Sequence, residues 1–96
     1  MAALTHKVYA TSEELTGLEQ FRFRRAAFLR FRHGDMAFFQ YQRGAIDEAR
    51  LRSSLKVLNL SNPRMKAFWN DIKQNFVEPY RVYIDQLIDE QDASVL

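Results

Sequence analysis

The chain has 96 residues, which is enough for one compact domain and leaves little room for a second. Hydrophobic residues make up 47% of the sequence and aromatic residues 14%, so the chain is too apolar to be disordered. The formal net charge of +2 is too small to predict a polyanionic partner on its own. The longest apolar runs, at residues 26–29 and 36–39, fall far short of the roughly 20 residues that cross a bilayer.

The sequence start and the cysteine content favour a cytoplasmic protein. The first twenty residues lack the basic start and continuous apolar stretch of a signal peptide, and the chain has no cysteine that could form a disulfide. Charge is unevenly distributed: residues 1–56 contain ten Lys or Arg and six acids, a net +4, whereas residues 57–96 contain four and six, a net −2. This asymmetry favours packing of one half on the other, or head-to-tail contacts between molecules.

The N-terminal third is predicted to be a loose arm followed by a helix. Residues 1–10 show no clear period and form the expected arm. Thr11 and Glu14 have the spacing of a capping box, so a helix is expected to begin there. Residues 21–33 alternate like a strand over short pieces, but no two-residue hairpin turn separates those pieces. The longer window follows a helical period, which favours a helix.

This predicted helix has two sides when it is projected at about 100° per residue. One broad side is apolar and contains Phe21, Phe23, Ala27, Phe28, Phe31, Phe38 and Phe39. The other side holds most of the basic residues, which are Arg22, Arg25, Arg30, Arg32 and His33. Arg24 is the exception, because it falls within the aromatic side. Gly34 leaves two alternatives open: it ends the helix and Asp35 caps a second one through Arg43, or the helix continues through it at a cost of about 1 kcal/mol.

The following segment contains clear helix boundaries. Gly44 is predicted to end a helix in the left-handed conformation that glycine tolerates best. Asp47 is expected to cap the next helix, which runs to about Asn59. Residues 61–63, Ser-Asn-Pro, mark another start, because proline at a first-turn position has no hydrogen bond to lose.

The last segment has the strongest helical period of the chain. Apolar residues recur three and four positions apart at Met65, Phe68, Trp69, Ile72 and Phe76. Pro79 then bends the chain or begins a last helix. The apolar face of that helix consists of Tyr80, Tyr83, Ile84, Leu87 and Ile88. Residues 91–96 are predicted to be a frayed tail. Together these elements predict an all-α domain over residues 1–96, a small bundle of four to five helices.

Few residues suit catalysis or metal binding. The chain has no cysteine nucleophile, only three glycines and no phosphate loop, and its two histidines, His6 and His33, are 27 residues apart. His33 beside Asp35 resembles a base with its orienting carboxylate, but a solvated helix end is the commoner meaning of such a pair. The acids at residues 47–48 and 85–90 have ordinary uses in helix capping and on an exposed face. We therefore predict no enzymatic activity, no cofactor and no metal.

The stretch from Gln20 to His33 is the strongest candidate for function, because it contains five arginines, four phenylalanines and no acid. Arg22, Arg25 and Arg32 share one strip of the predicted helix. The guanidinium group of arginine can form paired hydrogen bonds with the carboxylates of a protein partner or with the phosphates of a nucleic acid. Two further alternatives for this stretch are a face that is simply exposed to solvent and a face that lies on a membrane surface. The expected partner-binding residues are Arg22, Arg25, Arg30, Arg32, Phe21, Phe28 and Phe31.

The aromatic content points to a partner or to a tightly filled core. Eight Phe, one Trp and four Tyr are difficult to bury in a bundle of this size, so some of them either form a patch that a partner covers or fill the core closely. Both alternatives remain open from the sequence. We expect a non-enzymatic interaction module that binds another protein or a second copy of itself. A small nucleic-acid-binding protein that uses the arginines of residues 22–32 is the alternative.

Residues 41–88 carry a resemblance to known proteins. The motif Tyr-Gln-Arg-Gly-Ala-Ile-Asp-Glu occupies residues 41–48, and Pro63, Trp69, Phe76, Pro79 and Asp85 follow it. This part of the chain resembles a group of uncharacterised bacterial small helical proteins with a Y-x-x-G-x-I/L-D-E turn and a W…F-x-P segment, although here two residues separate Phe76 from Pro79. The resemblance implies a helical fold and supplies no activity that could be carried over to this chain. Members often carry an N-terminal membrane helix, which this sequence lacks.

Overall fold

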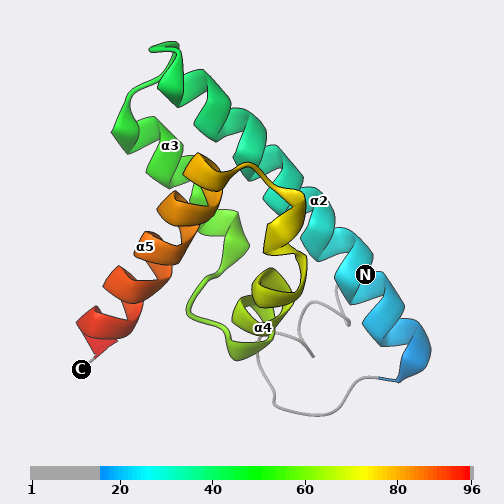
Figure 1. Ribbon diagram of the computed structural model, residues 1–96. Helices are drawn as coiled ribbons and strands as arrows, with labels where there is room; N and C mark the ends of the chain where they lie inside the picture. Colours follow the sequence, from blue (N-terminus) through cyan, green and yellow to red (C-terminus); the bar gives the residue numbers. More distant parts are fainter. Residues whose placement is uncertain (1–15, 96) are drawn as a thin grey trace.

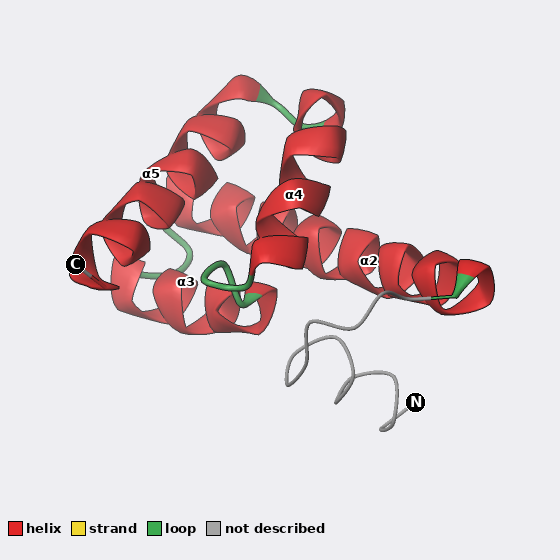
Figure 2. Cartoon of the chain, turned by 90° about the horizontal axis from the view of Figure 1, so that it is seen from below, coloured by secondary structure: helices red, strands yellow, loops and turns green. Residues whose placement is uncertain are grey.

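The computed structural model describes residues 16–95 of the chain, with side chains for residues 16–93. In this range it contains four α-helices and two short 3-10 turns: α2 (Gly17–Gln42), α3 (Glu48–Leu55), η1 (Lys56–Leu58), α4 (Pro63–Ile72), η2 (Lys73–Asn75) and α5 (Glu78–Val95). The described residues include no strand (Figure 2). The predicted all-α fold is therefore confirmed.

A capping box begins α2. The Thr16 hydroxyl accepts a hydrogen bond from the Glu19 amide at 3.2 Å, and the Thr16 amide donates to Glu19 Oε1 at 3.0 Å. Each side chain thereby satisfies an amide that the first turn leaves without a helical partner. Thr11 and Glu14, predicted to form such a box, and the predicted arm at residues 1–10 lie outside the described residues.

Gly34 does not end the helix, because α2 continues through it to Gln42. Gly34 is buried, and a Cβ atom there would meet the Tyr80 hydroxyl at 2.6 Å and Leu55 Cδ2 at 2.9 Å. The Tyr80 hydroxyl donates a hydrogen bond of 2.8 Å to the Phe31 carbonyl oxygen. Only a residue without a side chain leaves room for this contact, so the second of the two predicted alternatives is correct.

The predicted boundaries at Gly44, Asp47 and Asn62 are confirmed. Gly44, which follows the C-cap residue Arg43 of α2, has a φ of +78°, in the left-handed region. The Asp47 carboxylate accepts from the Arg50 amide at 2.8 Å at the start of α3. The Asn62 side chain caps α4, in which Pro63 is the first residue. Local residue chemistry therefore sets three of the helix ends.

Two helix ends differ from the predictions. The helix predicted to reach Asn59 is α-helical only to Leu55, because the chain tightens into η1 before Asn59 takes a left-handed φ of 48°. The tail predicted to fray over residues 91–96 instead continues α5 to Val95. In that last stretch Asp92 accepts a hydrogen bond of 2.7 Å from Lys66 of α4, which holds the helix to the bundle.

Helix α2 forms one side of the molecule, and the shorter helices pack against it (Figure 1). Its 26 residues make it about 39 Å long, and it contacts α3, η1 and α4. The core is one hydrophobic cluster with Trp69 fully buried at its centre. The Phe31 ring stacks on Trp69 at 4.9 Å, and the indole N–H donates to Asp85 at 2.8 Å. The end of α2 where the helix begins extends beyond the other helices (Figure 2).

Candidate binding surface

Helix α2 has apolar residues on two opposite sides. The buried side, which faces the core, consists of Phe23, Ala27, Phe31, Gly34 and Phe38. The opposite side, which we call the outer face, consists of Leu18, Phe21, Arg22, Arg25, Leu29, Arg32, Met36, Phe39 and Arg43. All nine outer-face residues are exposed. The outer face therefore makes no contribution to the core of this chain.

The apolar residues of the outer face are unusually accessible. The five large ones, Leu18, Phe21, Leu29, Met36 and Phe39, are between 52% and 64% exposed. Single exposed apolar side chains are normal on any protein, but here five lie along one face of a single helix, with arginines between them. Of the eight phenylalanines, five are buried in the core, whereas Phe21 and Phe39 are exposed on this face. Phenylalanine therefore occurs both in the core and on the exposed surface of the described chain.

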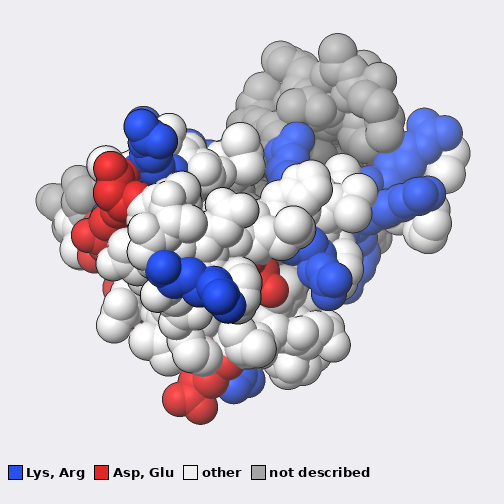
Figure 3. Space-filling view, turned by 90° about the horizontal axis from the view of Figure 1, so that it is seen from above, with Lys and Arg blue, Asp and Glu red and all other residues white. Residues whose placement is uncertain are grey.

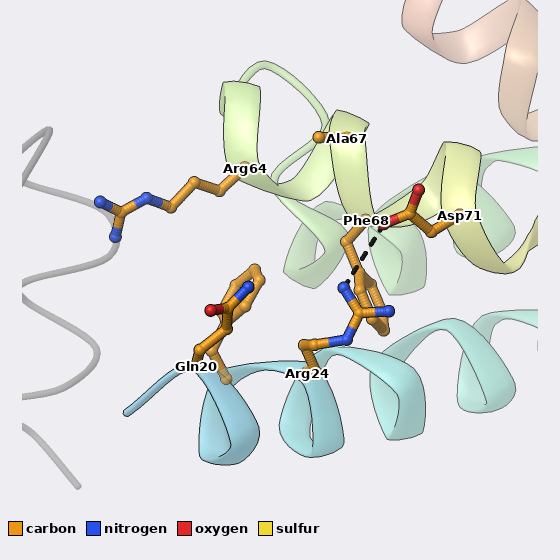
Figure 4. A pocket seen from close by; sticks show the side chains of 7 residues that line it. Gln20, Arg24, Arg64, Ala67, Phe68 and Asp71 are labelled. Carbon is orange, nitrogen blue, oxygen red and sulfur yellow. Dashed lines mark hydrogen bonds and ion pairs between the residues drawn. The ribbon is translucent and has the colours of Figure 1, made fainter. Parts of the chain in front are cut away.

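The predicted arginines separate into three environments. Arg22, Arg25 and Arg32 lie on the outer face, as the strip predicted from the sequence requires. Arg30 is half-buried on the flank of α2. Arg24, the exception in the sequence projection, lies with its guanidinium 4.8 Å from the Phe68 ring centre and forms an ion pair of 3.4 Å with Asp71 (Figure 4). Arg24 therefore helps to hold α2 against α4.

Among the described residues, Arg22 and Arg25 have no ion-pair or hydrogen-bond partner. Arg32 lies 6.0 Å from the Phe28 ring centre, and Arg43 lies 5.2 Å from the ring centre of Phe39. Basic side chains gather at the end of the molecule where α2 begins (Figure 3). The outer face thus combines exposed apolar side chains with positive charges that have little to neutralise them.

Not every predicted contact residue is accessible. Phe31 is completely buried against Trp69 and Phe68, so it cannot contact a partner, and its inclusion in the predicted surface is corrected. Phe28 is half-buried, with its ring 6.0 Å from that of Phe76. Phe21 is exposed as predicted. The sequence projection placed these residues on one broad side and could not show which of them α4 would cover.

Three hollows lie along the first half of α2. One lies on the outer face, has a volume of about 510 Å³ and is lined by Leu18, Phe21, Arg22, Arg25, Ala26 and Leu29. A second, of about 470 Å³, lies between α2 and α4 and is lined by Phe28, Phe68 and Ile72 together with outer-face residues. The third, of about 430 Å³, contains Gln20 and the Arg24–Asp71 pair (Figure 4). All three are open to solvent.

The titratable side chains that could act in catalysis or metal binding are exposed or already take part in contacts within the fold. His33 is exposed, and Asp35, two residues on, is half-buried, so burial raises the pKa of its carboxyl while Arg32 lowers it. Asp85 accepts from the Trp69 indole and lies 3.4 Å from Lys73. No group of three or more metal-binding side chains is found in the described part of the chain. Burial raises the pKa of Tyr80, whose hydroxyl is used in the contact with α2.

Comparisons with known protein families, with characterised proteins and with solved structures found no match to this chain. The resemblance of residues 41–88 to uncharacterised helical proteins therefore stays a prediction. No helix among residues 16–95 is long and apolar enough to span a bilayer.

Proposed function

We propose that the protein is a non-enzymatic protein-interaction module that binds through the outer face of α2. The exposed apolar side chains carry this proposal. Each is about half covered already, so burying the remainder contributes about 1 kcal/mol per residue. Five such residues would supply about 5 kcal/mol, which is comparable to the lower estimates for the cost of association. Additional contacts from the arginines are therefore needed for stable binding.

The arginines suit a protein surface that is both apolar and acidic. The guanidinium groups of Arg22 and Arg25 can donate bidentate hydrogen bonds to carboxylates. Their aliphatic stems can also cover apolar side chains of the partner. Phenylalanine, methionine and arginine, which the outer face combines, are enriched in protein interfaces relative to the rest of the surface.

Binding of nucleic acid is supported less well. The arginines of the outer face alternate with leucine, methionine and phenylalanine, and phosphates gain nothing from contact with aliphatic side chains. Among the described residues, three ion pairs between α-helices involve Arg24, Arg52 and Lys66, so these basic groups already have acidic partners within the fold. A nucleic-acid complex would lose affinity steeply between about 50 and 200 mM salt, whereas an apolar protein interface would not.

An affinity purification with two matched variants tests the proposal. The first variant, Phe21→Ser with Leu29→Ser, makes the outer face polar. The second, Val57→Ser with Val82→Ser, changes two apolar residues that are also exposed but lie outside α2. We expect proteins that co-purify with the wild type to be lost with the first variant and retained with the second. Identical sets of bound proteins for all three chains, or a nuclease-sensitive and salt-sensitive complex, would contradict it.

A further inference from the structure

We propose that the outer face of α2 binds the outer face of α2 in a second copy of this chain, with the two helices antiparallel. This inference rests on the proposed function and names its partner. The two-fold axis would pass beside α2 between residues 30 and 31. The facing pairs would be Leu18 with Arg43, Arg22 with Phe39, Arg25 with Met36, and Leu29 with Arg32, each formed twice.

The spacing of the outer face is that of a helix that packs along another helix. Eight of its residues follow one another alternately four and three positions apart: Leu18, Arg22, Arg25, Leu29, Arg32, Met36, Phe39 and Arg43. This average spacing of 3.5 residues is the repeat of a coiled-coil seam. It extends over almost all of α2. A compact ligand would require only one or two turns of such a repeat, whereas a second long helix uses all of it.

The order of arginine and apolar residues selects the direction of the second helix. A parallel pair would place Arg22, Arg25 and Arg32 each against its own copy, and like charges that face one another are unfavourable. In the antiparallel register given above, every layer instead combines one apolar residue with one arginine. The arginine stem can then cover the apolar side chain while its guanidinium reaches solvent.

The order of arginine and apolar residues along the outer face also selects the register of the two helices. A shift by one heptad in one direction places Arg22 against Arg32 of the second copy. A shift in the other direction places Arg25 against Arg43. Both shifts place arginine directly opposite arginine, whereas in the proposed register arginines of the two copies meet only between neighbouring layers, as the two Arg32 side chains do beside the two-fold axis. A heterologous partner would need no such self-complementary order, which favours a second copy over a different protein.

The hollow on the outer face is an open surface that side chains of a second copy could contact. It lies over the first half of α2, between Leu18 and Leu29, and has a volume of about 510 Å³. In the proposed register Met36 and Phe39 of the second copy lie above it. These are also exposed apolar residues of the second half of α2. Arg43 already lies 5.2 Å from the Phe39 ring centre within one chain, so an arginine beside this ring is an arrangement that the surface adopts.

The surroundings of α2 are compatible with this contact. Helix α3, the η1 turn and α4 contact α2, whose buried residues all lie on the side opposite the outer face. Asp35 precedes Met36 in α2, is half-buried and lies near Arg32, whose guanidinium lowers the pKa of the Asp35 carboxyl. Its carboxylate would offset part of the positive charge that two such faces bring together.

Cross-linking of single-cysteine variants tests the arrangement, because the chain contains no cysteine of its own. A size-tagged Arg25→Cys chain is mixed with an untagged Met36→Cys chain and treated with a short bismaleimide. We expect a cross-linked product of intermediate size from the mixture and much less product from either variant alone. Leu18→Cys with Arg43→Cys should behave in the same way at the ends of the helix. Arg25→Cys with Val82→Cys of α5 is the control that should give no product.

The outcomes separate the inference from the proposed function. Efficient cross-linking of each variant with itself would indicate a parallel pair and would overturn the inference. A lack of product from both layer pairs at tens of micromolar, with a monomer in sedimentation experiments, would also overturn it. The proposed function would survive that result if the Phe21→Ser, Leu29→Ser variant still lost co-purified proteins, and would fail together with the inference if it did not.

Discussion

Replacement of Gly34 by alanine tests the closest contact in the fold. In an exposed helix the change would stabilise the protein by about 1 kcal/mol, because alanine is the better helix former. Here the new Cβ would lie 2.6 Å from the Tyr80 hydroxyl and 2.9 Å from Leu55 Cδ2. The tyrosine must therefore move away from the Phe31 carbonyl oxygen, to which it now donates a hydrogen bond of 2.8 Å.

The magnitude follows from three contributions. Loss of the Tyr80 hydrogen bond costs about 0.5–1.5 kcal/mol. The extra methyl group in a filled core costs a further 1–3 kcal/mol, roughly. After the gain of about 1 kcal/mol in helix propensity is subtracted, we expect Gly34→Ala to lower the free energy of unfolding by roughly 0.5–3.5 kcal/mol. Gly17→Ala is the control, because a Cβ there meets nothing within 4 Å, and its effect should stay within about 0.5 kcal/mol.

Urea denaturation followed by the fluorescence of the single tryptophan, Trp69, measures these differences. A second comparison identifies the cause. In a Tyr80→Phe background the oxygen atom is gone, so Gly34→Ala should cost about 1 kcal/mol less than it does in the wild type. A stabilising effect of Gly34→Ala in the wild-type background would refute the close contact between α2 and α5.

Three further predictions concern polar contacts. Asp85→Ala leaves the buried Trp69 indole N–H without its acceptor, so the free energy of unfolding should fall by about 1–3 kcal/mol; an unchanged urea midpoint would show that the hydrogen bond contributes little. Thr16→Ala removes the capping box of α2 and should cost about 1 kcal/mol, with faster amide exchange confined to the first turn of that helix. Asp35 has a pKa raised by burial, so its folded form holds a proton more tightly than the unfolded chain does, and its ionisation reduces stability as pH rises above about 4. Asp35→Asn should therefore be more stable than the wild type at pH 7, and the difference should disappear in acid; a difference that grows in acid would contradict the sign.

Local residue chemistry made much of the fold predictable. The caps at Asp47 and Asn62 and the left-handed Gly44 depend on neighbours within a few residues, and the structure confirms them. The role of Gly34 could not be predicted in the same way. Its place in an unbroken helix depends on Tyr80, which is 46 positions away in the sequence and reaches it only after the bundle has formed.

The candidate surface was predictable in part. The arginine strip at Arg22, Arg25 and Arg32 follows from the helical period alone, and the structure places all three on the exposed side of α2. The apolar half of the surface was not predictable, because α2 carries phenylalanine on both sides. A projection treats Phe21 and Phe31 alike, yet one is exposed and the other completely buried. Phe31 is buried because α4 packs over it, and the position of α4 cannot be read from the period of α2 alone.

A residue swap across one layer tests the central claim most directly. In the proposed register Arg22 faces Phe39 of the second copy, and both side chains are exposed, so changes there should leave the fold intact. Phe39→Arg alone would place arginine against arginine in two layers. Arg22→Phe combined with Phe39→Arg would restore one aromatic residue against one arginine in each.

Sedimentation equilibrium on the wild type and both variants measures whether each chain is a monomer or a dimer. The account predicts a wild-type species of twice 11.4 kDa, a weakened or absent dimer for Phe39→Arg, and recovery of the dimer in the double variant. A monomeric wild type, or a double variant in which association stays as weak as in Phe39→Arg, would contradict antiparallel pairing through the outer face of α2.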